Sequence, residues 1–435
     1  MGLSDLLNKK DESALPGALS PRRPRSLRRR ILLLAAVAGP GIIAANAGND
    51  AGGIATYASA GSQYRYRALF IMVLITVGLV LVQEMSARLG AITGKGLAAL
   101  IREEFSIRLA SLALLALLVA NVGIVVSEFA GIGAAFELFG VSRYISVPIA
   151  AIAIWVLVLF GTYRYAERVF LLLSLAFLSY PIAAILGHPH WSAVGIDTIT
   201  PHFTASRGFV LLCVALIGTT ISPYMQLYNA GAVVDRGIGP DEYPIERVDT
   251  VAGAIFADII SWFIIVATAA AIGGSGALTS AKQAAEALRP VAGPSAEVLF
   301  GLGLLGASAL AGAIVPLSTS YALAEAVGVE RSVSRSFREA PLFLGLFTGQ
   351  VLIGALVALV PVNLISLLIG TQILQGIVTP ITLVFILTLA NRRSLLGDHA
   401  NGTIFRVVAT ISVAVVSLMS AALVLLTVLG WFGVH

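Results

Sequence analysis

Long apolar runs recur along the whole sequence, and they constrain the fold more than any other feature. A helix needs about 20 apolar residues to cross the hydrocarbon core of a bilayer, and it satisfies its backbone polar groups internally, as lipid requires. The pattern predicts an all-α polytopic membrane protein of about eleven transmembrane helices. The predicted spans are approximately 31–61, 66–90, 107–139, 144–161, 166–187, 207–235, 248–273, 295–327, 340–361, 364–390 and 403–433.

The composition excludes several other classes of protein. Of the 435 residues, 58% are hydrophobic and 12% are charged, which is more apolar than a soluble domain needs. The single cysteine, Cys213, rules out a disulfide framework and a cysteine-based metal cluster. We find no phosphate-binding glycine loop with lysine, no nucleophile elbow and no HExxH motif, so we expect neither an enzyme nor a cofactor.

The basic residues indicate how the chain lies in its membrane. Residues 1–30 are polar and rich in arginine and proline, and we interpret them as a disordered cytoplasmic tail. With this tail inside, the inner loops carry fourteen Lys or Arg residues and the outer loops carry six. We therefore expect a protein of the plasma (cell inner) membrane, with its N-terminus cytoplasmic and its C-terminus extracytoplasmic. The basic residues are distributed according to the side of the membrane, so their excess does not indicate binding to nucleic acid. We expect the lipid bilayer as a partner, but no nucleic acid and no obligate protein.

Asp50 is a lone carboxylate within the first apolar span, with Gly48, Gly52 and Gly53 around it. A carboxylate at bilayer depth costs roughly 2.5–3.5 kcal/mol on insertion scales, so such acids usually serve function. Glycines weaken the helix at the same place and leave peptide groups free to turn toward a ligand. This pattern favours a cation site in an unwound helix. The alternative is a kinked span whose acid pairs with a neighbouring helix.

A second interrupted span appears five spans later. The segment 211–234 reads LLCVALIGTTISPYMQLYNAGAVV, with Gly218, Thr219, Thr220, Ser222 and Pro223 at its centre. Proline removes a backbone donor and breaks the helix. Two broken helices, each opening a set of five spans, predict an inverted repeat with its site between the breaks. The predicted parts are a first repeat at 31–187, an extracellular loop at 188–206, a second repeat at 207–390, and an eleventh helix with the C-terminus at 391–435.

At these residues the chain resembles the Nramp family of divalent-metal transporters, which have a LeuT-like 5+5 inverted-repeat fold with helices 1 and 6 broken. The stretches AGPGIIAANAGNDAGGI and VQEMSARLGAITGKGLAALIREEF carry the closest resemblance. The family pattern has Asp-Pro-Gly-Asn at the first break and Met-Pro-His at the second. Here Asp50 and Pro223 are kept, while Gly53 stands at the position of the metal-binding Asn and Ser222 at that of the Met. The changed motif is similar to that of the Nramp-related magnesium transporter branch.

These departures bear on the substrate. A thioether favours Mn²⁺ and Fe²⁺ over the hard Mg²⁺ ion, so its loss removes that discrimination. Mg²⁺ keeps several of its waters and needs few protein ligands, and small residues leave room for that water. The resemblance also places a glutamine of the tenth span, Gln372, beside the ion. The candidate ion-site residues are Asp50, Ala47, Gly53, Thr219, Thr220, Ser222, Tyr224 and Gln372.

The residues that the resemblance links to proton transport are changed as well. Glu128 matches one family acid, but Asn121 and Gly131 replace two others, and Tyr224 and Asn229 replace histidines. Histidine is the side chain that best exchanges protons near neutral pH. We therefore predict an alternating-access transporter of partly hydrated Mg²⁺, and also of Mn²⁺, that is not coupled to protons.

Three weaker signals have open interpretations. Asp258 either faces the ion path or makes a polar contact between helices, and Glu128 either takes a proton or pairs with an arginine. Glu84 near a span end is expected to be solvated. The amphipathic stretch 280–288 is expected to lie along the outer membrane surface.

Other functions remain as alternatives. The nearest is a proton-coupled Mn²⁺ or Fe²⁺ symporter that tolerates the loss of the Met. An amino-acid transporter of the same fold needs no central acid, so Asp50 counts against it. A membrane enzyme or receptor requires polar clusters at a membrane face, which the sequence lacks.

Overall fold

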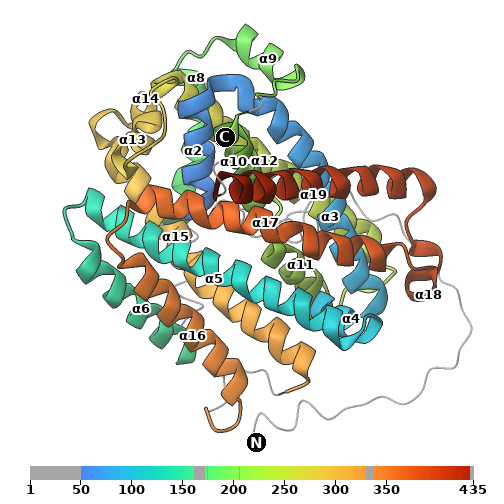
Figure 1. Cartoon of the computed structure of the whole chain (residues 1–435). Helices are drawn as coiled ribbons and strands as arrows, with labels where there is room; N and C mark the ends of the chain where they lie inside the picture. Colours follow the sequence, from blue (N-terminus) through green and yellow to red (C-terminus); the bar gives the residue numbers. More distant parts are fainter. Residues whose placement is uncertain (1–49, 161–171, 174, 205, 330–336, 432–435) are drawn as a thin grey trace, which may run out of the picture. The chain divides into compact units, whose positions relative to one another are not determined.

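Apolar helices dominate the computed structural model (Figure 1). It describes residues 50–160, 172–173, 175–204, 206–329 and 337–431, all within one compact unit that begins at Gly39. The basic tail, Ala47 and the first part of the first predicted span lie outside the described residues.

The helices follow the predicted spans closely. The first half of the chain contains α2 (Ala51–Tyr64), η2 (Arg65–Ala68), α3 (Leu69–Thr93), α4 (Leu97–Glu104), α5 (Ile107–Leu138), α6 (Arg143–Leu159), η3 (Leu175–Leu178), α8 (Ser179–Leu186) and α9 (Trp191–Ile199). The second half contains α10 (Arg207–Thr220), α11 (Pro223–Asp235), α12 (Tyr243–Ile272), α13 (Ala281–Ala285), η4 (Glu286–Leu288), α14 (Arg289–Ala292), η5 (Gly293–Ser295), α15 (Ala296–Val327), α16 (Pro341–Ala358), α17 (Leu364–Ala390), α18 (Arg393–Leu396), η6 (Gly397–His399) and α19 (Thr403–Trp431).

Eight stretches of the described residues are long and apolar enough to cross a membrane. Two shorter apolar helices, at Arg143–Leu159 and Leu175–Leu186, fall in the fourth and fifth predicted spans. Each of the eleven predicted spans therefore overlaps a helix, and the all-helical membrane class is confirmed.

One group of helices is built around α5. This helix packs against α6, α15, α16 and α17, which lie beside it in Figure 1. Small residues allow the close approach, as where Gly354 of α16 lies against Val125 and Phe129 of α5. In lipid, small residues promote helix association because they let backbones and side chains interlock.

A second group joins the two broken spans to their neighbours. Helix α2 packs against α10, α12 and α17. Gly61 of α2 lies directly on the backbone of α12 at Ile265 and Ala269, and Gly218 of α10 lies on the backbone of α17 at Gln372 and Gly376. These contacts join α2 and α10 to the continuous helices α12 and α17.

The end of α3 corrects the expectation that Glu84 is solvated. Glu84 is only 3% exposed, because the start of α12 and the segment after α18 cover it. It pairs with Arg88 at 3.1 Å and with Arg247 at 3.4 Å, and the hydroxyl of Tyr243 donates a hydrogen bond to it. Ion pairing replaces the water that the sequence pattern led us to expect.

The stretch 280–288 also differs from its prediction. It forms α13 and η4, whose residues Ala284, Ala287 and Leu288 are fully buried. The two segments pack against α12, α15 and α8. The apolar face of this stretch is therefore covered by protein instead of lipid, and its position along the outer membrane surface stays a prediction.

The contact between α10 and α17 generates a stability prediction. A methyl group at position 218 would meet the backbone of Gln372 and Gly376, which cannot move aside as a side chain can. Overpacking of this kind costs about 1–3 kcal/mol, so Gly218→Ala is expected to lower the apparent melting temperature of the purified protein. Gly231→Ala is the matched control, because nothing lies within 4 Å of its added carbon. Equal melting temperatures for the two variants would contradict the packing described here.

Candidate functional site

The predicted first break falls at Asp50, the first described residue, which caps the N-terminus of α2. Its backbone is extended, with φ −69° and ψ 172°, and its Oδ1 accepts a 2.6 Å hydrogen bond from the backbone N–H of Gly53. A carboxylate is favoured at this position because free N–H groups and the positive end of the helix dipole meet there. The side chain is 3% exposed. Gly53 thus contributes a backbone donor to the acid.

The second break separates α10 from α11 at Ile221 and Ser222. Ile221 has φ −107° and ψ 51°, and Ser222 has φ −63° and ψ 135°, so neither residue continues the helix. The Ser222 hydroxyl donates to the carbonyl of Gly218 at 2.8 Å and to that of Thr219 at 3.1 Å. The hydroxyl proton of Ser222 is therefore used in hydrogen bonds at the end of α10. Only the lone pairs of the hydroxyl oxygen remain for contact with a ligand.

Gln372 of α17 lies between the two breaks. Its side-chain amide occupies the place where a side chain at residue 52 would begin, and its backbone carbonyl lies against Gly218. Gln372 is fully buried, yet among the described residues neither atom of its amide has a hydrogen-bond partner. A buried polar group without a partner costs about 1–3 kcal/mol, so this amide is a strong candidate for contact with water or an ion.

Other hydroxyls without partners belong to the same region. Ser127 of α5 lies beside the Gln372 amide against Gly52, and Thr219 follows Gly218 in α10. Both hydroxyls are buried, and within the described part of the chain neither has a hydrogen-bond partner. Through the contacts of Gln372, the structure brings the start of α2 close to the end of α10, and it adds Ser127 to the predicted residues of this region. Its position next to Glu128 is the only sequence signal that pointed to it.

Glu128 lies on the α5 side of this centre. It is fully buried, and its carboxylate makes only weak hydrogen bonds, with the backbone N–H of Ala51 and the hydroxyl of Ser308, neither of which has ideal geometry. It interacts electrostatically with Asp50. The interpretation that Glu128 pairs with an arginine is therefore wrong for the described part of the chain. Two acids share one buried region.

Thr220 and Tyr224 lie near the second break but in different roles. The Thr220 hydroxyl is 2.9 Å from the hydroxyl of Tyr57 on α2, so it joins the two broken spans. Tyr224 is buried and interacts electrostatically with both Asp50 and Glu128. Tyr57 was not singled out by the sequence, because a tyrosine in an apolar helix gives no distinctive pattern.

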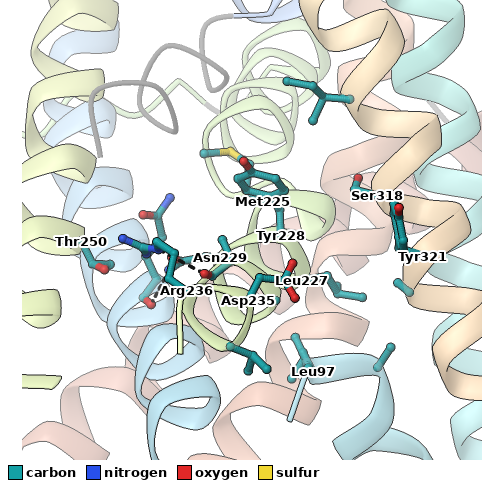
Figure 2. Close-up of a pocket in the computed structure, with 18 of the residues that line it drawn as sticks. Leu97, Met225, Leu227, Tyr228, Asn229, Asp235, Arg236, Thr250, Ser318 and Tyr321 are labelled. Atoms are coloured by element: carbon teal, nitrogen blue, oxygen red, sulfur yellow. Dashed lines mark hydrogen bonds between the residues drawn. The ribbon is translucent and has the colours of Figure 1, made fainter. Parts of the chain in front are cut away.

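A cavity of about 610 Å³ leads toward the second break (Figure 2). It extends from Asp235, at the end of α11, to Met225, two residues after Pro223. Thr250 of α12 and Tyr321 of α15 lie on opposite sides of the α11 residues Met225 and Tyr228 in Figure 2. The lining includes four acidic residues and one arginine, which are Asp235, Glu246, Asp249, Glu325 and Arg236.

The cavity wall contains charged side chains, but the described residues do not form a metal-binding cluster there. Arg236 pairs with the buried Glu246 at 2.6 Å, which neutralises one of the acids. Among the described residues, no group of three or more His, Cys, Asp or Glu side chains could hold a metal ion. A cation at the breaks therefore depends on one or two carboxylates together with neutral oxygen atoms.

This geometry predicts the effect of a single methyl group at Gly52. Gly52→Ala would displace the Gln372 amide and crowd the Ser127 hydroxyl, so binding of divalent cations is expected to weaken strongly. Calorimetric titration of the purified protein with Mg²⁺ and Mn²⁺ measures this. The control is Gly231→Ala, which lies in the cavity wall and has open space around it. Unchanged affinity in Gly52→Ala would place the ion elsewhere.

Comparison with known families gives one match over most of the chain. The family described as "Natural resistance-associated macrophage protein-like", abbreviated Nramp, matches residues 41–426.

Named relatives match over similar lengths. The chain is 29% identical over 416 residues to a protein of Ralstonia nicotianae named "Divalent metal cation transporter MntH", covering 89% of this chain and 90% of the relative. It is 28% identical over 442 residues to "Divalent metal cation transporter MntH 1" of Pseudomonas aeruginosa, covering 97% and 95%.

Solved structures confirm the predicted fold. A manganese transporter of Eremococcus coleocola, in complex with an aromatic bis-isothiourea compound, superposes with a TM-score of 0.72 at 18% identity, covering 94% of this chain and 90% of that one. MhsT in complex with L-phenylalanine superposes with a TM-score of 0.58 at 16% identity, covering 88% and 97%. At these identities the likeness shows the fold, which is the LeuT-like fold expected from the sequence.

Proposed function

Because this chain belongs to the Nramp family, we propose that it is a secondary transporter of divalent cations that carries chiefly partly hydrated Mg²⁺, and also Mn²⁺, without proton coupling. Relatives along its whole length are named divalent metal cation transporters, which supports the substrate class. The choice of ion rests on one observation. Several buried side-chain oxygen atoms around Gln372 have no hydrogen-bond partner among the described residues and are free to contact a cation or its water.

These donors suit a hard cation that keeps part of its water. Asp50 supplies negative charge, and the amide and hydroxyl oxygens of Gln372, Thr219 and Ser127 supply neutral contacts. Mg²⁺ is usually held through one or two carboxylates while it keeps several waters. Unpartnered buried polar atoms are the kind of atoms that ordered water satisfies. These side chains thus fit an ion that keeps part of its hydration shell and contacts most of them through its bound water molecules.

Neutral side chains support transport without protons. Asn121, at the position of a family acid, donates to the hydroxyl of Thr319 at 2.7 Å, and Gln350 donates to the carbonyl of Pro316 at 3.2 Å. The described histidines lie between α8 and α9, after α9 and in η6, away from the breaks. Along α5, no titratable side chain lies between Arg108 and Glu128, the stretch that contains Asn121.

The membrane potential is sufficient to drive such an ion inward. It supplies about 2.3 kcal/mol per charge at about 100 mV, hence about 4.6 kcal/mol for a divalent ion. The acidic cavity wall at Asp235, Asp249 and Glu325 fits the cytoplasmic exit, in keeping with the charge bias that places the N-terminus inside. Alternating access then consists of movement of α2, α10 and α11 against the helices around α5.

A proton-coupled Mn²⁺ or Fe²⁺ symporter is the second candidate. Two observations favour it: Glu128 is a buried acid that interacts electrostatically with Asp50 and has no ion-pair partner among the described residues, and the thioether of Met225 lines the cavity. A buried carboxyl group can carry a proton, and a thioether favours softer ions.

Uptake into liposomes tests the proposal directly. Wild-type protein is expected to take up Mg²⁺ and to be inhibited competitively by Mn²⁺, whereas Asp50→Ala is expected to be inactive because the site loses its charge. Asp241→Ala is the matched control, since Asp241 lies exposed between α11 and α12. Magnesium uptake that survives in Asp50→Ala would refute the site.

The same liposomes distinguish the second candidate. With a pH-sensitive dye inside, the proposal expects Mg²⁺ uptake without acidification and no uphill uptake when a pH gradient is imposed. Acidification that depends on the metal ion would establish proton coupling and favour the symporter.

A substitution at the second break tests the selectivity argument. Ser222→Met returns a thioether to the position where the family has one, so the preference is expected to shift toward Mn²⁺ and Cd²⁺. It also removes the hydroxyl that caps Gly218 and Thr219, so total activity is expected to fall while the ratio changes. Ser366→Met, on the exposed first turn of α17, is the control. An unchanged Mg²⁺ to Mn²⁺ ratio would mean that residue 222 does not face the ion.

A further inference from the structure

Asp258, in the middle of α12, is a second buried acid outside the site described above. It is 5% exposed, and its Oδ2 has no hydrogen-bond partner in the part of the chain that the structure describes. Its neighbour Ala257 lines the cavity but Asp258 does not. The interpretation that Asp258 faces the ion path in this conformation is therefore not supported, and its role needs a separate explanation.

Hydrogen bonding offers little support for a charge on Asp258. The Thr76 hydroxyl of α3 hydrogen-bonds to Asp258 and also donates to the carbonyl of Met72 at 2.7 Å. A hydroxyl has one proton, so the two acceptors compete for it. A protonated carboxyl group removes this competition, because it can donate to the Thr76 oxygen instead.

A chain of hydroxyl groups joins Asp258 to the second break. Tyr57 of α2 is fully buried, interacts electrostatically with Asp258 and hydrogen-bonds to Ser261, one turn further along α12. The same Tyr57 hydroxyl is 2.9 Å from that of Thr220, the last residue of α10. Asp258 therefore lies beside the hydroxyl contacts through which α2 meets α10 and α12.

No charged partner offsets a negative Asp258 in the described part of the chain. The titratable side chains on the elements packed against α12 are Asp50, Tyr57 and Tyr64 on α2, Arg65, Tyr66 and Arg67 on η2, Glu84 and Arg88 on α3, Tyr180 on α8 and Glu286 on η4. Of these, Tyr57 interacts with Asp258. On α12 itself, Asp249 and Arg247 lie at least two helical turns away. An unpaired charge in this environment costs several kcal/mol.

We propose that Asp258 is a second proton-binding site, separate from the ion site, which holds its proton while α2 and α10 pack on α12 and releases it when they move apart and admit water. This rests on the proposed transport function. The proton comes from and returns to the aqueous phase on the same side, so it regulates the conformational change without being carried across the membrane. Low pH then stabilises the arrangement described here, and high pH stabilises the arrangement in which Asp258 is hydrated.

Infrared spectroscopy of the purified protein tests the proton without any transport. The difference between wild type and Asp258→Asn is expected to contain the band of a protonated carboxyl group at neutral pH. The difference between wild type and Asp241→Asn is expected to lack it, because Asp241 is exposed. Absence of the band from the first difference would overturn the proposal, whether or not the protein moves magnesium.

Transport measurements test the regulation. With equal pH on both sides, the rate of Mg²⁺ uptake by wild type is expected to vary with pH by at least about fivefold, the low end of ordinary coupling between two sites. Asp258→Asn is expected to be active and insensitive to pH. Tyr57→Phe is expected to keep the infrared band but to lose most of the pH dependence, because the link to Thr220 is removed.

Three results would overturn the regulatory role. They are a wild-type pH profile in Asp258→Asn, a wild-type pH profile in Tyr57→Phe, and a requirement for sodium that Asp258→Asn removes. The last result would identify the ligand as a metal cation instead of a proton. If Asp258→Asn does not fold, the Tyr57→Phe profile and the pH titration of the wild-type band still decide the question.

Discussion

The capping of α2 by Asp50 is the interaction on which the rest of the site depends. In hydrocarbon, backbone groups must find partners inside the protein, and a broken helix leaves several without one. Asp50 supplies a partner for Gly53 and brings a charge to the break, while Ser222 supplies its proton to the carbonyls at the end of α10. The start of α2 and the end of α10 are thereby each stabilised by hydrogen bonds within their own span. The polar atoms left over, on Gln372, Thr219 and Ser127, are those from which an ion site can be built.

Close helix packing holds these leftover groups in place. Gly52 and Gly218 let Gln372 of α17 lie against both broken spans, and Gly61 lets α2 rest on α12. The helices around α5 form a separate packed group that supplies Ser127 and Glu128. The site therefore lies where two groups of helices meet, which is the arrangement that allows movement of one group to open or close access.

Two further acids flank Asp50 and differ in their surroundings. Glu128 shares the ion region and interacts with Asp50, so it is the acid through which a proton-coupled mechanism would act. Asp258 reaches the region only through Tyr57 and Thr220. The acidic cavity along α11 adds negative charge on one side of the breaks, which raises the local concentration of cations there.

The sequence by itself determined the all-helical membrane class, the positions of the apolar helices, the interruption at Ser222 and the acid at Asp50, because apolar length, glycine, proline and a lone acid act locally along the chain. It could not show that the Ser222 hydroxyl caps α10, that Gln372 lies against Gly52, or that Glu84 and stretch 280–288 are covered by protein. It also left the partners of Glu128 and Asp258 open. These features depend on which helices meet across hundreds of residues, and only tertiary packing decides that.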